Sequence, residues 1–430
     1  MEWNVAMWRK HALELANFLT PLTKDLGRSE RRVGAARYIE GLLLPGGRKS
    51  IEPLAERLQV DAQSLQQFIA DSPWEEQKVW SAVRREVIAS IEPLVAWIVD
   101  ETGWLKQGDQ SVGVSHQYCG AVGKQANCQV AVEIVATDGQ IAAPLAARLY
   151  LPKSWTDHPE RCRKAGVPEE IEFATKPEIA LQLLDVVLAD QVARAPVLGD
   201  SVYGDNSEFR AGLKARGFEY FLQVTRSSHK GWTEEVPTER KVRRRHVAEG
   251  APDSRTLEQI VNDLPAKAWQ NARWKATDGT TRRTRLAWIE VFLGHNLRHA
   301  NGELERVWLI ADWPKGDETP YQLFLAHLHA PPTRAQCLLL ARARWQVEQL
   351  IQRCKDDLGF DHYEGRSWRG FHHHHVLTAV AYLFVLVVYL RSKKTSGLTW
   401  EMTLRAILPC LVRFIGFCPC CKSTQFEDST

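Results

Sequence analysis

Two short apolar segments of this sequence each lead directly into an aspartate. Residues 94–99 precede Asp100, and residues 195–199 precede Asp200. Short apolar runs of this kind are typical of buried strands. Acids that follow such strands are exposed at the rim of a sheet, where ligands bind in α/β folds. The sequence therefore predicts an α/β fold whose sheet carries two carboxylates to one edge.

A third acid, Glu348, lies in a segment with helical periodicity that begins at residue 333 and ends near residues 358–359. Arg344, Glu348, Gln352 and Lys355 are spaced at i, i+4, i+8 and i+11. At 100° per residue these four side chains share one side of a helix. That face offers a carboxylate between two cations that could hold phosphates. The alternative is a solvated helix with a Glu–Arg pair.

The three acids together indicate a metal site. Carboxylates brought close to one another repel and raise one another's pKa, and a divalent cation removes that conflict. Two Mg²⁺ ions held by such acids can activate a water or a 3′-hydroxyl and stabilise the leaving oxygen of a phosphodiester. We therefore expect Asp100, Asp200 and Glu348 to bind two Mg²⁺ or Mn²⁺ ions and to be the catalytic residues.

The first 92 residues have the periodicity of helices. Residues 51–70 read as a helix, a short turn and a second helix, with Asp61 as the N-cap of the second. The second helix would present four polar side chains suited to base edges and phosphates. These are Gln63, Ser64, Gln66 and Gln67. The alternative is a helical hairpin that does not bind DNA.

Between the acids the pattern changes twice. Strand-like and helical runs surround the two aspartates. The strand-like runs are 112–121, 129–136 and 220–224, and the helical runs are 180–193 and 207–216. Residues 226–335 are largely strand-like, with runs at 286–293, 306–311 and 321–327, and the helices 371–390 and 400–414 come last. The sequence predicts five segments. They are an N-terminal helical DNA-binding domain (1–92), a first part of the core (93–225), a β-rich insertion (226–335), a second part of the core with the Glu348 helix (336–395) and a helical tail (396–430).

The net charge of the 430 residues is only +3, which by itself does not indicate a nucleic-acid-binding protein. The basic residues are clustered, however. The densest block spans residues 240–246 and includes Arg243, Arg244 and Arg245. Such a block could neutralise DNA phosphates. The alternative is a solvated charged face.

Cysteine usage and hydropathy favour a reducing cytosol. The nine cysteines are irregularly spaced, which is unlike a disulfide framework. The C-terminal Cys418, Cys420 and Cys421 lack the second ligand pair that a closed zinc site needs. The N-terminus does not resemble a signal peptide. The most apolar run, residues 379–390, is too short to span a bilayer and predicts a buried core helix, so we expect no membrane partner.

Two further acids and a run of histidines near these motifs could serve either the active site or the packing of the protein. Glu101 and Asp205 could support the proposed ligands, although solvated surface acids are the more ordinary reading. The run His372–His375 could approach phosphate or metal, but it is better explained as the start of a helix with one or two packed histidines.

Three stretches of the sequence resemble the DDE-superfamily transposases of bacterial insertion sequences. They are VDETGW around Asp100, LGDSVYGD around Asp200 and RWQVEQLIQRCKDDLGFDHYEGRSWRGFHHH after residue 343. The resemblance covers about residues 50–390. It implies an RNase H-like mixed sheet with helices, interrupted between the second Asp and the Glu by a β-rich insertion. Asp200 follows Asp100 by 100 residues and Glu348 follows Asp200 by 148, which leaves room for that insertion.

The third stretch is the most specific, because it is similar to the family's Tyr–Arg–Glu–Lys signature. Arg344 stands four residues before Glu348 and Lys355 stands seven after it, as the signature requires. The signature tyrosine would fall at Ala341, so this position departs from the pattern. In hairpin-forming relatives the residue after the arginine is a tryptophan that stacks on a flipped base. The corresponding residue is Trp345, for which a place in the core is the alternative.

The resemblance implies a cut-and-paste DNA transposase. Such an enzyme binds the terminal inverted repeats of its element and target DNA as double strands, acts as a homodimer on DNA, and cleaves and transfers strands with divalent metal. The expected DNA contacts are Arg344, Trp345, Gln352, Lys355 and the basic block 243–245. One alternative keeps the fold as a host-adopted nuclease or DNA-binding regulator. Another, a glycoside hydrolase with two of the acids, would leave Arg344 and Lys355 unexplained.

Overall fold

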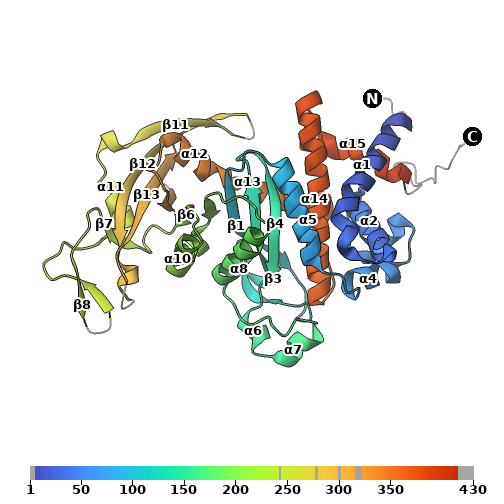
Figure 1. Cartoon of the computed structure of the whole chain (residues 1–430), viewed down its shortest axis with the longest axis horizontal. Coiled ribbons are helices and arrows are strands. Elements are labelled where there is room, and N and C mark those ends of the chain that lie inside the picture. The colour runs from blue at the N-terminus through green and yellow to red at the C-terminus, as the bar shows by residue number, and fades with distance from the viewer. Residues whose placement is uncertain (1–4, 242–243, 277–278, 299–301, 315–321, 415–430) are drawn as a thin grey trace, which may run out of the picture.

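A mixed β-sheet passes through the middle of the protein (Figure 1). The computed structural model describes residues 5–414, apart from residues 242–243, 277–278, 299–301 and 315–321. The strands of this sheet are β1 Ala96–Leu105, β2 Ser115–Cys119, β3 Lys124–Thr137, β4 Ala142–Leu149, β5 Val197–Gly199, β6 Tyr220–Val224, β7 Lys230–Trp232, β10 Arg255–Thr256, β11 Gln270–Lys275, β12 Thr281–Leu293, β13 Glu305–Pro314 and β14 Gln322–His327. Their order is β10-β7-β12-β13-β14-β6-β5-β1-β3-β2, with β4 beside β3 and β11 beside β12.

Helices precede, cover and follow this sheet. They are α1 Val5–Thr23, α2 Ser29–Leu43, α3 Ile51–Leu58, α4 Ala62–Ala70, α5 Glu76–Ser90, α6 Lys153–Thr156, α7 Pro159–Lys164, α8 Lys176–Ala189, α9 Ser201–Gly204, α10 Ser207–Ala215, α11 Leu257–Asn262, α12 Arg334–Ala343, α13 Trp345–Leu358, α14 Trp368–Ser396 and α15 Trp400–Phe414. A separate hairpin is formed by β8 Thr238–Lys241 and β9 Arg244–Val247.

The centre of the sheet has the mixed arrangement expected of an RNase H-like core. β1 pairs antiparallel with β3 on one side and parallel with β5 on the other. β5 pairs parallel with β6, and β3 pairs with β2 along its first part and with β4 along its second. Helices that cover the sheet contribute much of the core. The predicted α/β fold class is therefore confirmed.

The β-rich insertion is not a separate sheet. Its strand β14 pairs antiparallel with β6 of the core, with Leu325 opposite Leu222, and β13 and β12 continue outward from β14. In Figure 1 these strands, coloured yellow to orange, lie to the left of the core strands. Pairing with β14 covers an edge of β6 whose backbone groups would otherwise be exposed. Core and insertion therefore share one hydrogen-bonded framework.

The predicted end of the first strand was wrong. β1 does not stop at Asp100 but continues to Leu105, paired with β3 throughout. The added residues include the buried Thr102 and Trp104, so burial continues past the acid. An apolar run ends where the first acid interrupts it, whereas a strand ends where its pairing and burial end. Asp100 therefore lies near the centre of its strand.

Several predicted helix boundaries are confirmed. The two helices predicted within residues 51–70 are α3 and α4, and Asp61 caps α4 by accepting a hydrogen bond from the backbone N–H of Ser64 at 2.7 Å. The Glu348 helix ends at Gly359, whose φ of 66° suits a glycine C-cap. The helices predicted for the last part of the chain are α14 and α15.

The long helix α14 is a central element of the packing. It is long and apolar enough to cross a membrane by length and composition, but 78% of its most apolar window is buried inside the protein. In Figure 1 it stands beside the N-terminal helices, coloured blue. This burial fits the predicted core helix.

All four histidines at the start of α14 are buried, not one or two as predicted. His373 stacks on Trp74 with ring centroids 3.4 Å apart, and His374 hydrogen-bonds Tyr38 at 2.9 Å. Burial lowers the pKa of His373 to about 3 and that of His374 to about 4. The histidines are therefore neutral packing residues that join the N-terminal helices to the core.

Candidate active site

The three predicted acids come from three neighbouring elements. Asp100 lies on β1, Asp200 follows β5 directly, and Glu348 lies in the first turn of α13. Because β1 and β5 are adjacent and parallel, with Ile98 opposite Leu198, each aspartate lies two residues beyond this pair, on neighbouring segments of the chain. Asp200 also caps α9 by accepting a hydrogen bond from the backbone N–H of Val202 at 2.9 Å.

The guanidinium of Arg344 connects two of the acids. Its Nη1 lies 3.3 Å from Oδ2 of Asp100, and its Nη2 donates to Oε1 of Glu348 at 2.9 Å. Arg344 sits at the junction of α12 and α13 with helical backbone angles, so the predicted i, i+4 contact with Glu348 forms although the helix is divided there. Arg344 thus brings Glu348 to the sheet that carries Asp100.

The electrostatics of the aspartates also indicate a shared site. Burial raises the pKa of Asp100 to about 7, the Arg344 guanidinium opposes this rise, and the negative charge of Asp200 adds to it. Burial likewise raises the pKa of Asp200. The two carboxylates therefore lie within electrostatic reach of each other, and an added cation would stabilise both in their charged form.

Glu101 points to the opposite face of the sheet, since successive residues of a strand alternate. There it forms an ion pair with Lys176 of α8 and lies 3.5 Å from the hydroxyl of Tyr203. Asp205 accepts hydrogen bonds from the backbone N–H of Thr225 and from the side chain of Ser228. Neither acid is a freely solvated surface residue, so that reading of both was wrong. Each holds neighbouring elements together.

The donor chemistry of the site fits a hard divalent cation. In the described part of the chain, no three Asp, Glu, His or Cys side chains converge closely enough to enclose a metal. Mg²⁺ does not require such a cage, because it is commonly held by one or two carboxylates together with waters and substrate phosphates. The Arg344 guanidinium shows that positive charge is accommodated between Asp100 and Glu348. Asp100, Asp200 and Glu348 are therefore suitable oxygen donors.

The remaining predicted residues of α13 take different positions. Lys355 donates to the carbonyl of Gly103 on β1 at 3.0 Å, whereas Gln352 is exposed. Trp345 is 48% exposed and lines a hollow of about 370 Å³ together with Trp274 and Arg344. The alternative of a core tryptophan is therefore wrong for Trp345. The hollow leaves its indole open to a ligand beside the acids.

The predicted basic block is only partly described. Arg245 lies on β9 and its Nε donates to the hydroxyl of Thr238 at 3.2 Å. Arg243 and the side chain of Arg244 lie outside the described residues, as do the C-terminal Cys418, Cys420 and Cys421. Figure 1 places β8 and its hairpin at the lower left end of the molecule, away from the core strands. The structure thus does not bring the described part of the block to the three acids.

A fourth acid, Glu133, was not identified from the sequence. It is buried on β3 directly opposite Asp100, so the two side chains project from the same face. Burial raises its pKa to about 8, the charge of Asp100 adds to the rise, and Lys355 opposes it. Nε2 of the neutral His375 lies 3.7 Å from its Oε1. No short motif surrounds Glu133, because only strand register places it beside Asp100.

The burial of Glu133 predicts a pH-dependent loss of stability. Its pKa is raised from 4.5 to about 8 by folding, so its contribution to stability is fully present below pH 4.5 and is lost as the pH rises to about 8. In EDTA, the Glu133→Gln variant should have the same free energy of unfolding as the wild type at pH 4.5. At pH 9 its free energy of unfolding should be higher than that of the wild type by roughly 5 kcal/mol, at about 1.4 kcal/mol for each pH unit. Urea unfolding across this range measures the difference.

The exposed Glu170 provides a matched control for this experiment. Glu170→Gln should follow the wild type at every pH, because a solvated carboxylate keeps nearly the same environment on unfolding. A Glu133→Gln variant whose stability stays parallel to that of the wild type from pH 4.5 to 9 would contradict the assigned environment of Glu133.

Comparison with known proteins agrees with this architecture. A family model described as DDE superfamily endonuclease matches residues 21–283, which contain Asp100 and Asp200 but not Glu348. A probable transposase for the insertion sequence element IS701 from Microchaete diplosiphon is 30% identical over 212 residues, which are 48% of this chain and 52% of that protein. The chain thus spans about half the length of this curated relative. Since the family model covers more than half of the chain, this protein belongs to the DDE superfamily of endonucleases.

Proposed function

We propose that this protein is a DNA transposase that cuts and joins DNA with Asp100, Asp200 and Glu348. The observation that carries the proposal is the arrangement around Arg344, which joins Glu348 to Asp100 beside Asp200. Family membership and the likeness to a probable insertion-sequence transposase support the same reading. Glu348 lies beyond the matched segment, so its assignment rests on this geometry and on the signature spacing.

The proposed cofactors are two Mg²⁺ or Mn²⁺ ions, held by these three acids, which would polarise the attacking oxygen and stabilise the leaving oxygen. The chain itself binds and orients the DNA. Arg344 and Lys355 suit phosphate oxygens, Gln352 adds an exposed amide, and Trp345 offers an indole on which a base could stack. In the first step water attacks the phosphodiester at the element end and releases a 3′-hydroxyl.

In the second step that 3′-hydroxyl attacks a phosphodiester of the target DNA. A new phosphorus–oxygen bond forms as the old one breaks, and the displaced 3′ oxygen takes up a proton. Since one bond replaces another, neither ATP nor a covalent protein intermediate is required. The proposed contacts to the terminal inverted repeats are the polar face of α4 and the hairpin of β8 and β9, which carries the basic block. Cutting both ends together implies a homodimer on DNA, working on the bacterial chromosome in the cytoplasm.

The proposal is tested by cleavage of a DNA fragment that carries the element's own ends. We expect cuts at those ends with Mg²⁺ or Mn²⁺, no cuts in EDTA, and no cuts at matched positions in a fragment with scrambled ends. Specific binding without cleavage in either metal would instead indicate a DNA-binding regulator. Metal-dependent cutting without preference for the ends would indicate a nuclease.

A further inference from the structure

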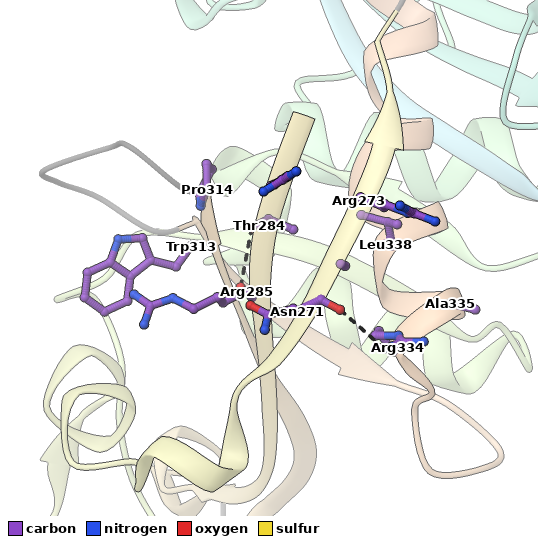
Figure 2. A pocket seen from close by; sticks show the side chains of 11 residues that line it. Asn271, Arg273, Thr284, Arg285, Trp313, Pro314, Arg334, Ala335 and Leu338 are labelled. Atoms are coloured by element: carbon purple, nitrogen blue, oxygen red, sulfur yellow. Dashed lines mark hydrogen bonds between the residues drawn. The ribbon is translucent and has the colours of Figure 1, made fainter. Parts of the chain in front are cut away.

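The β-rich insertion carries a hollow of about 900 Å³ that the proposed chemistry does not use (Figure 2). It lies between β11, β12, the end of β13 and the first turn of α12. Among the described residues, its lining contains no aspartate or glutamate but four arginines, all exposed: Arg273, Arg283, Arg285 and Arg334. We refer to this hollow as the arginine groove.

Strand register concentrates positive charge in the arginine groove. β11 and β12 are antiparallel, with Arg273 opposite Arg283 and Asn271 opposite Arg285. Opposite residues, and residues two apart along a strand, project from the same face, and like charges directly opposite one another destabilise a sheet. Among the described residues no carboxylate forms an ion pair with any of the four arginines. The described part of the chain therefore leaves this positive charge facing solvent, where an anionic partner can reach it.

Two of the guanidinium groups are held in place while still offering donors. Arg285 lies over the rings of Trp313 and Trp269, at 4.5 and 5.6 Å from the ring centroids. Arg334 donates one hydrogen bond, to the backbone carbonyl of Asn271 at 3.3 Å, which Figure 2 shows as a dashed line. A guanidinium has five N–H donors in a planar fork that matches phosphate oxygens. Prepositioned groups of this kind lose little entropy when they bind phosphate.

The arginine groove is connected to the candidate active site by α12. This helix begins at Arg334 in the groove and ends at Ala343, next to Arg344. β11 and β12 also contribute Trp274 and Arg282 to the hollow that contains Trp345. At a rise of 1.5 Å per residue α12 is about 15 Å long, which corresponds to about four base pairs of duplex at 3.4 Å each. A duplex placed at the acids would therefore reach the groove within a few base pairs.

We propose that the arginine groove binds the sugar–phosphate backbone of duplex DNA next to the phosphodiester held at Asp100, Asp200 and Glu348. This inference rests on the proposed function, since it takes DNA as the substrate of the site. Guanidinium contacts to phosphate carry no base sequence, so the groove serves any duplex. It positions element ends and target DNA alike.

The test measures binding of a fluorescently labelled duplex of arbitrary sequence by anisotropy, in EDTA, over a series of KCl concentrations. The variant combines Arg273→Gln, Arg283→Gln and Arg334→Gln, and leaves the stacked Arg285 in place. Each lost phosphate contact lowers the salt slope by about 0.9, so the triple variant should lose about 2.7 from the slope of log K against log salt. Its affinity at about 0.15 M KCl should fall at least about tenfold.

Two matched variants complete the experiment. Removal of three exposed charges elsewhere, by Lys124→Gln, Arg163→Gln and Lys164→Gln, should leave the slope close to that of the wild type. The combined substitutions Arg273→Lys, Arg283→Lys and Arg334→Lys should restore most of the slope, because lysine keeps the charge. A glutamine triple variant with wild-type affinity and slope would overturn the proposal. The binding assay is run without metal and so does not depend on cleavage. If the wild type binds DNA through the groove here but never cleaves DNA in the separate assay with metal, only the proposed function is contradicted.

Discussion

Replacing Asp100, Asp200 or Glu348 singly with its amide is expected to lower the rate of DNA cleavage at least about 10³-fold. A bound cation supplies several kcal/mol of transition-state stabilisation, and each 1.4 kcal/mol corresponds to a factor of ten. The amide keeps the shape of the side chain but removes the charged oxygen that would bind the cation. Single-turnover cleavage of a duplex with the element ends, in Mg²⁺ and in Mn²⁺, measures the loss.

Measurements of metal binding and stability distinguish a role of these acids in cation binding from a structural role. The Asp100→Asn and Asp200→Asn variants should lose affinity for Mn²⁺ in a titration without DNA. They should nevertheless unfold at the same or a higher urea concentration than the wild type in EDTA at pH 8, because burial raises the pKa of both acids and so disfavours their charged forms. Loss of cleavage together with loss of stability would argue for a structural role.

Asp356 provides a control on the same helix as Glu348. It is exposed near the end of α13, beyond Lys355. Asp356→Asn should cleave like the wild type, since it is not among the residues that Arg344 brings to the sheet. Equal losses in Asp356→Asn and Glu348→Gln, or normal cleavage by Glu348→Gln, would contradict the assignment of Glu348.

Glu305→Ala is expected to reduce the free energy of unfolding by about 3–5 kcal/mol, because it breaks a buried ion pair. Glu305 lies at the start of β13 and is almost fully buried. Its carboxylate accepts from Arg210 at 3.0 Å and from the hydroxyl of Tyr220 at 2.8 Å, and lies 3.1 Å from Nζ of Lys214. These partners lie on α10 and β6, so Glu305 ties the insertion to the core. Without it the buried guanidinium of Arg210 loses its counter-charge.

Urea unfolding at pH 7 measures this loss, which should also lower the Tm by roughly 3–6 °C. Glu303→Ala, an exposed neighbour in the chain, should change the free energy of unfolding by less than about 0.5 kcal/mol. His295 and Arg210 hold the pKa of Glu305 well below its usual range. The contribution of this charge is thus present above pH 4.5 and declines as the pH falls further. A loss that persists unchanged at pH 3 would point to packing as the cause.

Much of the local structure could be predicted because its signals are local. Asp61 caps α4 through the N–H three residues away, and Gly359 ends α13 through its own φ angle. The alignment of Arg344 with Glu348 depends on one helical turn. Such features extend over a few residues, so a single stretch of sequence contains all the information that determines them.

Features that depend on strand register could not be predicted. Asp100 lies in the middle of β1 because pairing with β3 continues past it, and the same register places Glu133 opposite. The arginine groove arises from the pairing of Arg273 with Arg283 and from the arrival of α12 beside them. These contacts join residues far apart in the chain, and a shift of register by one would send the side chains to the other face.

The amino-acid sequence was enough to predict the α/β class, most of the helices and the family resemblance, and to propose three acids as metal ligands. Three further features became visible only in the folded protein: core and insertion share one sheet, Arg344 bridges Asp100 and Glu348, and the histidines of α14 are packing residues. The physical reason is that periodicity, capping and motif spacing act over one or two turns. Burial and strand pairing, in contrast, are settled by the whole chain at once.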